Sequence, residues 1–92
     1  SDVERAAAPV LHRSLRAGAE AVVAGERDPD VVRRIVAGPI DAEPFAELDY
    51  VGVVDAATFA DCARLAGEVR ILAAARFGRP RLLDNIGIIV PD

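Results

Sequence analysis

The spacing of apolar residues changes near residue 46, and this change constrains the fold more than any other feature of the sequence. Before it, apolar side chains recur every three or four residues, which is the period of one helix face. The first such stripe consists of Ala8, Leu11, Leu15, Ala19 and Val22. After residue 46 the chain carries β-branched and aromatic runs that are typical of strands. The order predicts helices first and a sheet second.

Two helices are predicted in the first part. The first runs to about Val23, and Gly18 within it leaves room for the close approach of a second element. The Asp-Pro pair at 28–29 begins the second helix, because Asp caps a helix and Pro fits its first position. We expect the Gly-Pro pair at 38–39 to close this helix, so that residues 39–44 form a connector.

Three strands are predicted in the second part, over residues 48–54, 68–77 and 82–90. Residues 58–64 are expected to form a short turn of helix. The Ala-rich stretch within 68–77 would also suit a helix, but apolar residues alternate there with arginines, and a period of two favours a strand. The tight connection at 78–80 makes the last two strands antiparallel neighbours.

These elements predict one small α+β domain over residues 1–92, in which two N-terminal helices pack on a three-stranded antiparallel sheet. The strands carry apolar residues on both faces, whereas a sheet covered on one side should alternate between apolar and polar positions. Two helices of this length cover only one face. We therefore expect the second face to meet a second copy of the chain or another domain of a longer polypeptide.

Two adjacent polar residues, Asp84 and Asn85, interrupt the last predicted strand. Buried polar groups require hydrogen bonds. We expect Arg76 or Arg81 to bind Asp84, and backbone groups of the turn to bind Asn85. These four residues are thus predicted to form a polar network that is structural or lies at a domain interface, and direct contact with a substrate is the alternative interpretation.

The charge distribution argues against a nucleic-acid partner. The net charge is −4, and the 11 basic residues are all Arg and are scattered along the chain. Only Arg79 and Arg81, which flank a proline, suggest a local anion contact, and solvent exposure is the simpler interpretation. No apolar run is long enough to span a membrane, so we expect no membrane partner and a cytoplasmic location.

The single cysteine and the single histidine do not make a reactive site. One cysteine cannot form an internal disulfide, and we interpret Cys62 as a buried, unreactive thiol and His12 as a residue at the border of the apolar stripe. Two candidate ligands are too few for structural zinc. No catalytic, cofactor-binding or metal-binding residue is therefore predicted in this chain.

Three stretches of the sequence carry a family resemblance: YVGVVD at 50–55, AAARFG at 73–78 and RLLDNI at 81–86. Their order and spacing resemble the C-terminal domain of the pantoate–β-alanine ligases, and the first helix is similar to the one that begins that domain. The resemblance covers essentially the whole chain. Around residues 59–62 the sequence departs from the family, whose members often have a proline there.

The resemblance implies an ATP-dependent reaction in two steps. Family members adenylate the carboxylate of pantoate in the presence of magnesium and release pyrophosphate, and the amine of β-alanine then displaces AMP. Their active site belongs to an N-terminal nucleotide-binding domain with a His-x-Gly-His-like motif and a Ser-Ser-Arg-type loop. The small C-terminal domain covers that site as a lid.

Neither motif is present in this chain, which also has no Gly-rich phosphate loop. The resemblance therefore implies a detached C-terminal lid domain that is inactive alone. Its expected partner is the N-terminal nucleotide-binding domain of the same polypeptide, and the resemblance implies that the parent enzyme uses ATP and magnesium. The alternative is a stand-alone interaction module that forms a homodimer through the open sheet face. An independent small enzyme is the weakest hypothesis, because the chain has no constellation of His, Cys or paired carboxylates.

Overall fold

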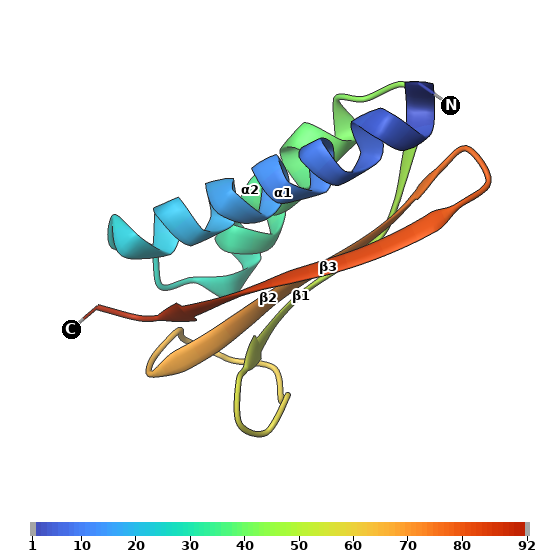
Figure 1. Cartoon of the computed structure of the whole chain (residues 1–92). Coiled ribbons are helices and arrows are strands. Elements are labelled where there is room, and N and C mark those ends of the chain that lie inside the picture. Colours follow the sequence, from blue (N-terminus) through green and yellow to red (C-terminus); the bar gives the residue numbers. More distant parts are fainter. Residues whose placement is uncertain (1, 92) are drawn as a thin grey trace.

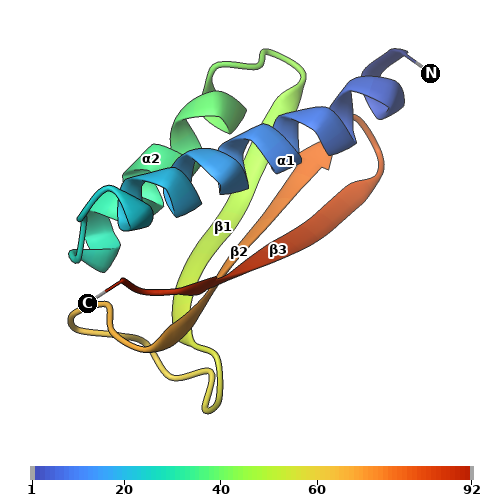
Figure 2. The same cartoon turned by 60° about the vertical axis from the view of Figure 1, so that its left-hand side comes forward.

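The fold has two layers, with both helices on one side of a three-stranded sheet, as Figure 1 and Figure 2 show. The computed structural model describes residues 2–91. Its elements, in chain order, are α1 (Asp2–Val23), α2 (Pro29–Asp41), β1 (Ala46–Asp55), β2 (Glu68–Phe77) and β3 (Arg81–Ile89). The strands are antiparallel and lie in the order β1-β2-β3. The predicted α+β architecture is confirmed.

The hydrophobic core lies between the helices and the sheet. Helix α1 contacts β2 and β3, and α2 contacts β1. The side chains of β2 that point toward the helices are fully buried, and they are Val69, Ile71, Ala73, Ala75 and Phe77. The helices contribute apolar side chains that include Leu11, Leu15, Val22, Val32, Val36 and Ile40. The strand predicted over 68–77 is confirmed, because burial there follows a period of two.

Gly18 sets the spacing between the two helices. A Cβ atom at this position would lie 2.5 Å from Val36 Cγ2 and 3.4 Å from Ile71 Cδ1. A separation of 2.5 Å is shorter than real Cβ contacts, so only glycine allows α1 and α2 to approach this closely. The close approach that the sequence predicts at Gly18 is therefore confirmed.

The predicted start of α2 is confirmed, and its predicted end is wrong. Asp28 caps the helix, and its side chain accepts a hydrogen bond from the N–H of Asp30 at 2.9 Å. The helix continues past residues 38–39, with Pro39 inside it. Proline lacks the N–H for one intrahelical bond, but the next residue, Ile40, is fully buried in the core. Burial of Ile40 outweighs the local signal to stop.

The connection between β1 and β2 is a loop, and the helical turn predicted over 58–64 is wrong. The carboxylate of Asp55 accepts hydrogen bonds from the backbone N–H groups two and three residues ahead, at 2.9 and 3.0 Å. Phe59 then adopts φ 59°, which is left-handed. Val54 forms an isolated bridge with Asp61. An Asp side chain that binds the backbone thus replaces the helical turn.

Arg27 joins three segments near the end of β3. Its guanidinium donates to the carbonyl oxygen of Val22 at 2.6 Å, in the last turn of α1, and to that of Pro91 at 2.7 Å, beyond β3. Its backbone carbonyl accepts a hydrogen bond from the N–H of Leu65 at 2.9 Å, in the loop between β1 and β2. Arg27 therefore holds a helix end, a loop and the tail together.

Candidate functional site on the open face of the sheet

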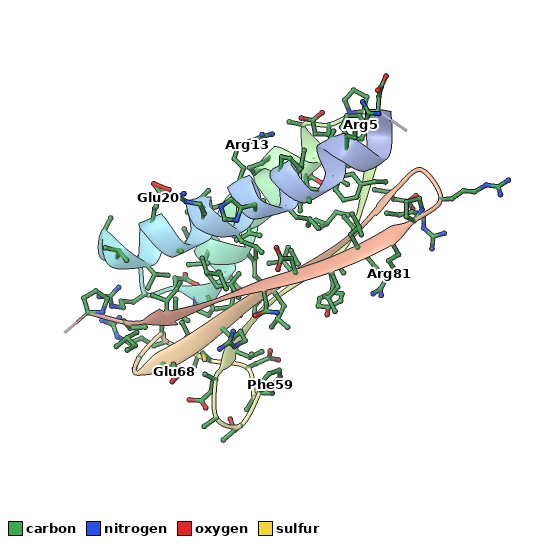
Figure 3. All side chains as sticks on the ribbon, in the orientation of Figure 1. Arg5, Arg13, Glu20, Phe59, Glu68 and Arg81 are labelled. Carbon is green, nitrogen blue, oxygen red and sulfur yellow. The ribbon has the colours of Figure 1, made fainter. Side chains whose placement is uncertain are left out.

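The face of the sheet that points away from the helices is the candidate functional surface, and we call it the open face. Residues alternate between the two faces of a strand, and the observed register places the following on the open face: Glu47, Tyr50, Gly52 and Val54 of β1, Glu68, Arg70, Leu72, Ala74 and Arg76 of β2, and Arg81, Leu83, Asn85, Gly87 and Ile89 of β3. Figure 3 shows Arg81 on this side, whereas Arg13 and Glu20 lie on the outer side of α1.

The centre of the open face is an apolar strip that crosses all three strands, formed by Tyr50, Leu72, Ala74 and Leu83. Tyr50 and Leu83 lie directly opposite Ala74 on the two neighbouring strands, and Ala74 is fully buried while they remain 41% and 56% exposed. Leu72 packs over Gly52 of β1, since a Cβ at Gly52 would lie in ordinary contact with Leu72 Cδ1, at 3.5 Å. Exposed apolar side chains gathered in one place on a sheet are typical of a contact surface.

The end of the open face near the β2–β3 turn carries balanced charges. Glu47, Arg76 and Arg81 lie in one row across the three strands. Two arginines directly opposite each other are unfavourable, and Asp49 relieves this by accepting a hydrogen bond from Arg81 Nε at 2.7 Å. Asp49 occupies a register shift in β1, where a bulge re-aims its side chain. These residues, with Leu48, line a cavity of about 110 Å³.

The other end of the open face carries a guanidinium held by an amide. Arg70 Nη1 donates to Asn85 Oδ1 at 2.8 Å, from β2 to β3. Gly87 lies directly opposite Arg70, and a Cβ at Gly87 would come within 3.1 Å of Arg70 Nη2. The glycine therefore gives the guanidinium room against β3, and the amide fixes its orientation.

The structure places Asp84 on the opposite face of the sheet from the two arginines predicted to bind it. Asp84 and Asn85 are both exposed, not buried. Asp84 lies on the helix side of β3, opposite Ala73, and accepts a hydrogen bond from the N–H of Asn85 at 2.8 Å. Arg76 and Arg81 lie on the open face, so the predicted pairing with Asp84 is wrong, because an odd separation along a strand places side chains on opposite faces.

The predicted partner of Asn85 is also wrong, because its amide binds Arg70 and not the backbone of the turn. Arg70 and Asp49 are absent from the predicted network. The alternation of side chains along residues 68–77 is a sequence signal that places Arg70 on the same face as Arg76, and it could have been used to predict Arg70. The contact between Asp49 and Arg81 depends on the bulge in β1, for which the sequence carries no clear signal.

Among the described residues outside the open face, the single cysteine and the single histidine lie on separate segments, the loop after β1 and helix α1. Burial raises the pKa of the half-buried Cys62 thiol, and the carboxylates of Asp55 and Asp61 raise it further. A thiol with a raised pKa stays protonated and is a poor nucleophile. His12 is exposed on α1. Neither helix within residues 2–91 combines the length and apolar character of a membrane span.

A second hollow lies on the helix layer, between α1 and β3. It has a volume of about 360 Å³ and is lined mainly by apolar side chains, which include Ala19, Val23 and Ile86. Arg16 and Glu20 stand at its border. Its mainly apolar lining distinguishes this hollow from the open face, which combines apolar side chains with arginines held by polar partners.

Comparison with known proteins points to one family. The family model described as pantoate-beta-alanine ligase matches residues 1–87. Pantothenate synthetase 2 of Frankia alni is 46% identical over 92 residues, which cover 100% of this chain and 27% of that protein. Pantothenate synthetase of Geobacillus thermodenitrificans is 44% identical over 91 residues, 99% of this chain and 32% of that protein.

A solved structure gives the same result. The crystal structure of pantothenate synthetase from Thermus thermophilus matches with a TM-score of 0.83 and 30% identity, over 94% of this chain and 31% of that one. The chain spans about a third of the length of these relatives.

Proposed function

This chain belongs to the pantoate–β-alanine ligase family, and from that premise we propose that it is the C-terminal lid domain of an ATP-dependent ligase that forms pantothenate from pantoate and β-alanine. Nearly the whole chain matches relatives named pantothenate synthetase, yet it spans only about a third of their length. The rest of such a polypeptide is the proposed partner, as an N-terminal nucleotide-binding domain. Because ATP is a proposed substrate, we also propose a cytoplasmic location.

The observation that carries the lid proposal is the open face. The helices cover one side of the sheet, and the other side exposes the apolar strip between two charged ends. A surface with an apolar centre and a polar rim has the composition of a protein contact that excludes water. A domain that closes over a reactive site needs such a surface.

The proposed reaction explains why a lid is useful. A carboxylate oxygen of pantoate attacks the α-phosphorus of ATP and expels pyrophosphate, which gives an acyl adenylate. The amine of β-alanine then attacks the acyl carbon, the bond from that carbon to the AMP oxygen breaks, and the amine loses a proton. Water competes for the same carbon, so a lid that excludes water directs the adenylate to pantothenate.

We assign the substrates and the nucleotide to the partner domain and not to this chain. The described residues contain no group of three or more His, Cys, Asp or Glu side chains that could hold a metal ion. We therefore place no magnesium ligand in this chain and derive no step through a metal from it. Its proposed contribution is to cover the site.

The test uses the complete polypeptide that contains residues 1–92. It is supplied with pantoate, β-alanine, ATP and magnesium, and AMP and pantothenate are measured together. We expect equal amounts of the two products. Replacing the exposed strip residues, as in Tyr50→Ser with Leu83→Ser, should raise the ratio of AMP to pantothenate, because a poorly seated lid admits water.

The matched control is Val23→Ser, which removes an exposed apolar side chain from the helix layer and should leave the ratio unchanged. A complete polypeptide that forms no pantothenate contradicts the ligase function. An unchanged product ratio in the Tyr50 and Leu83 variant contradicts the lid role alone.

A further inference from the structure

Arg70 differs from the other arginines of the open face in its charge balance. Arg81 is paired with Asp49, and Arg76 lies directly opposite Glu47. Arg70 is bound instead by the neutral amide of Asn85, and no described carboxylate forms an ion pair with it. A carboxylate would hold and neutralise a guanidinium, whereas an amide orients it and leaves its charge intact.

The guanidinium of Arg70 is also oriented in advance of any binding. Its side chain is half-buried. Asn85 fixes Nη1, and the missing side chain of Gly87 gives Nη2 its place against β3. An arginine that is already held in one orientation loses less conformational entropy when it binds a partner. The remaining N–H groups of the Arg70 guanidinium can still donate hydrogen bonds to an incoming carboxylate.

We infer that the open face docks onto the rest of the longer polypeptide and that Arg70 receives a carboxylate side chain of that surface. The inference rests on the proposed function, since it names the surface through which the lid would close. The apolar strip, whose members Tyr50 and Leu83 are exposed in this chain, becomes covered in the same contact. An apolar centre beside an oriented arginine is the composition of the residues that dominate binding energy in protein interfaces.

The shape of the surface favours a protein partner over a small anion. Small-molecule sites are concave. Neither the cavity near Arg76 and Arg81 nor the hollow beside α1 includes Arg70. Arg70 lies on the face of a sheet beside exposed apolar side chains, and only a partner of comparable breadth covers these together with the guanidinium.

The length of the relatives favours the rest of the polypeptide over a second copy of this chain, because the chain spans only about a third of them. In a two-fold dimer the same surface would have to supply the carboxylate for Arg70. Glu47 and Asp49 already accompany Arg76 or Arg81, which leaves Glu68, two residues from Arg70 on the same strand. A second copy is therefore the competing occupant, and light scattering tests for it.

Hydroxyl-radical labelling of the complete polypeptide tests this inference, with mass spectrometry to measure the oxidation rate of each side chain. After correction for the intrinsic reactivity of each residue type, Tyr50 and Leu83 should react at least about threefold more slowly than their exposure in this chain predicts, as expected for side chains in a dry interface centre. Val23, which is 61% exposed on the helix layer, should keep its full rate.

The variant Asn85→Asp separates an interface role of Arg70 from a structural one. The aspartate keeps the contact with Arg70 and supplies an internal counter-ion, which competes with the carboxylate of the partner. We expect the labelling rates of Tyr50 and Leu83 to rise by about threefold or more, because a desolvated charge pair at the interface is lost, while the melting temperature of the isolated chain is retained. A purely structural Arg70 would gain a stronger partner, and the labelling would not change.

The matched control is Asp84→Asn, at the adjacent position on the opposite face of β3, and it should leave the labelling of Tyr50 unchanged. Protection of Val23 in place of Tyr50 and Leu83 overturns the inference, as does full protection in the Asn85→Asp variant. Protection that depends on protein concentration and accompanies a dimer in light scattering assigns the face to a second copy. Normal pantothenate formation with an unprotected Tyr50 would refute this docking surface and leave the ligase function standing.

Discussion

The two faces of the sheet are built from the same three strands but contribute differently to the molecule. On the face toward the helices, Ile71 and Phe77 are fully buried. On the open face, Tyr50 and Leu83 remain largely exposed, with an arginine held at either end of the strip. Because alternate residues point to opposite sides of a strand, one face determines stability and the other is available for recognition. Substitutions on the two faces should therefore have separable effects.

The largest effect is expected from Phe77→Ala. The Phe77 ring is fully buried and packs against Phe45 with ring centroids 6.1 Å apart. Its truncation should lower the free energy of unfolding by about 3–5 kcal/mol, the usual range for a buried Phe. Leu83→Ala, on the open face, should cost less than about 1 kcal/mol, as exposed positions do. Urea denaturation of the chain measures both, and equal losses would abolish the distinction between the faces.

A smaller loss is expected from Gly18→Ala, which tests the close helix contact. The new Cβ would meet Val36 Cγ2 at 2.5 Å, and overpacking costs about 1–3 kcal/mol. The better helix propensity of Ala returns up to about 1 kcal/mol, so we expect a net destabilisation. In the background of Val36→Ala the same change should cost less, which a double-mutant cycle detects. A cycle without coupling contradicts the contact.

The ion pair between Arg81 and Asp49 should contribute less again. Both side chains are about half exposed, at 47% and 50%, and exposed pairs are worth about 0.2–1 kcal/mol. Asp49→Asn should lower the free energy of unfolding within that range. The difference from the unsubstituted chain should shrink at high salt, because salt screens exposed charges. A difference that does not respond to salt would mean that the pair acts through packing.

The smallest effect concerns Asp55 and acid. The backbone N–H groups of Thr58 and Ala57 lower the pKa of the Asp55 carboxyl below its ordinary value of 3.8. A carboxyl with a lower pKa in the folded state stabilises it fully above the ordinary value, and this contribution is lost as the pH falls through the folded value. Asp55→Asn should flatten that acid dependence, as urea unfolding over a pH series would reveal. An identical pH profile in the variant would count against the turn contacts.

The fold could be predicted wherever local pattern and burial agree. Alternation within 68–77 correctly indicates a strand despite its alanines, and the Asp cap correctly marks the start of α2. The predictions failed where tertiary contacts or side-chain bonds override local signals. Burial of Ile40 carries α2 through Pro39, and the carboxylate of Asp55 closes a turn where a helix was expected.

The candidate surface could be predicted only in outline. The expectation that two helices of this length cover only one face of the sheet is confirmed, and the expectation that a partner covers the other face stays a prediction. The hydrogen-bonded side-chain pairs on this surface depend on a bulge and on the register between strands, which the sequence of one strand does not reveal. A bulge in β1 presents Asp49 to Arg81, and the register of β2 with β3 brings Arg70 beside Asn85.

The hydrogen bonds of Arg27 have a mechanical consequence. They connect the last turn of α1, the loop after β1 and the tail beyond β3, so none of these segments can shift alone without breaking a bond to the others. We therefore expect the domain to move as a rigid body, with bending confined to chain outside these contacts. If the domain acts as the proposed lid, its rate of opening is set by the segment that joins it to the rest of the polypeptide and not by internal flexing.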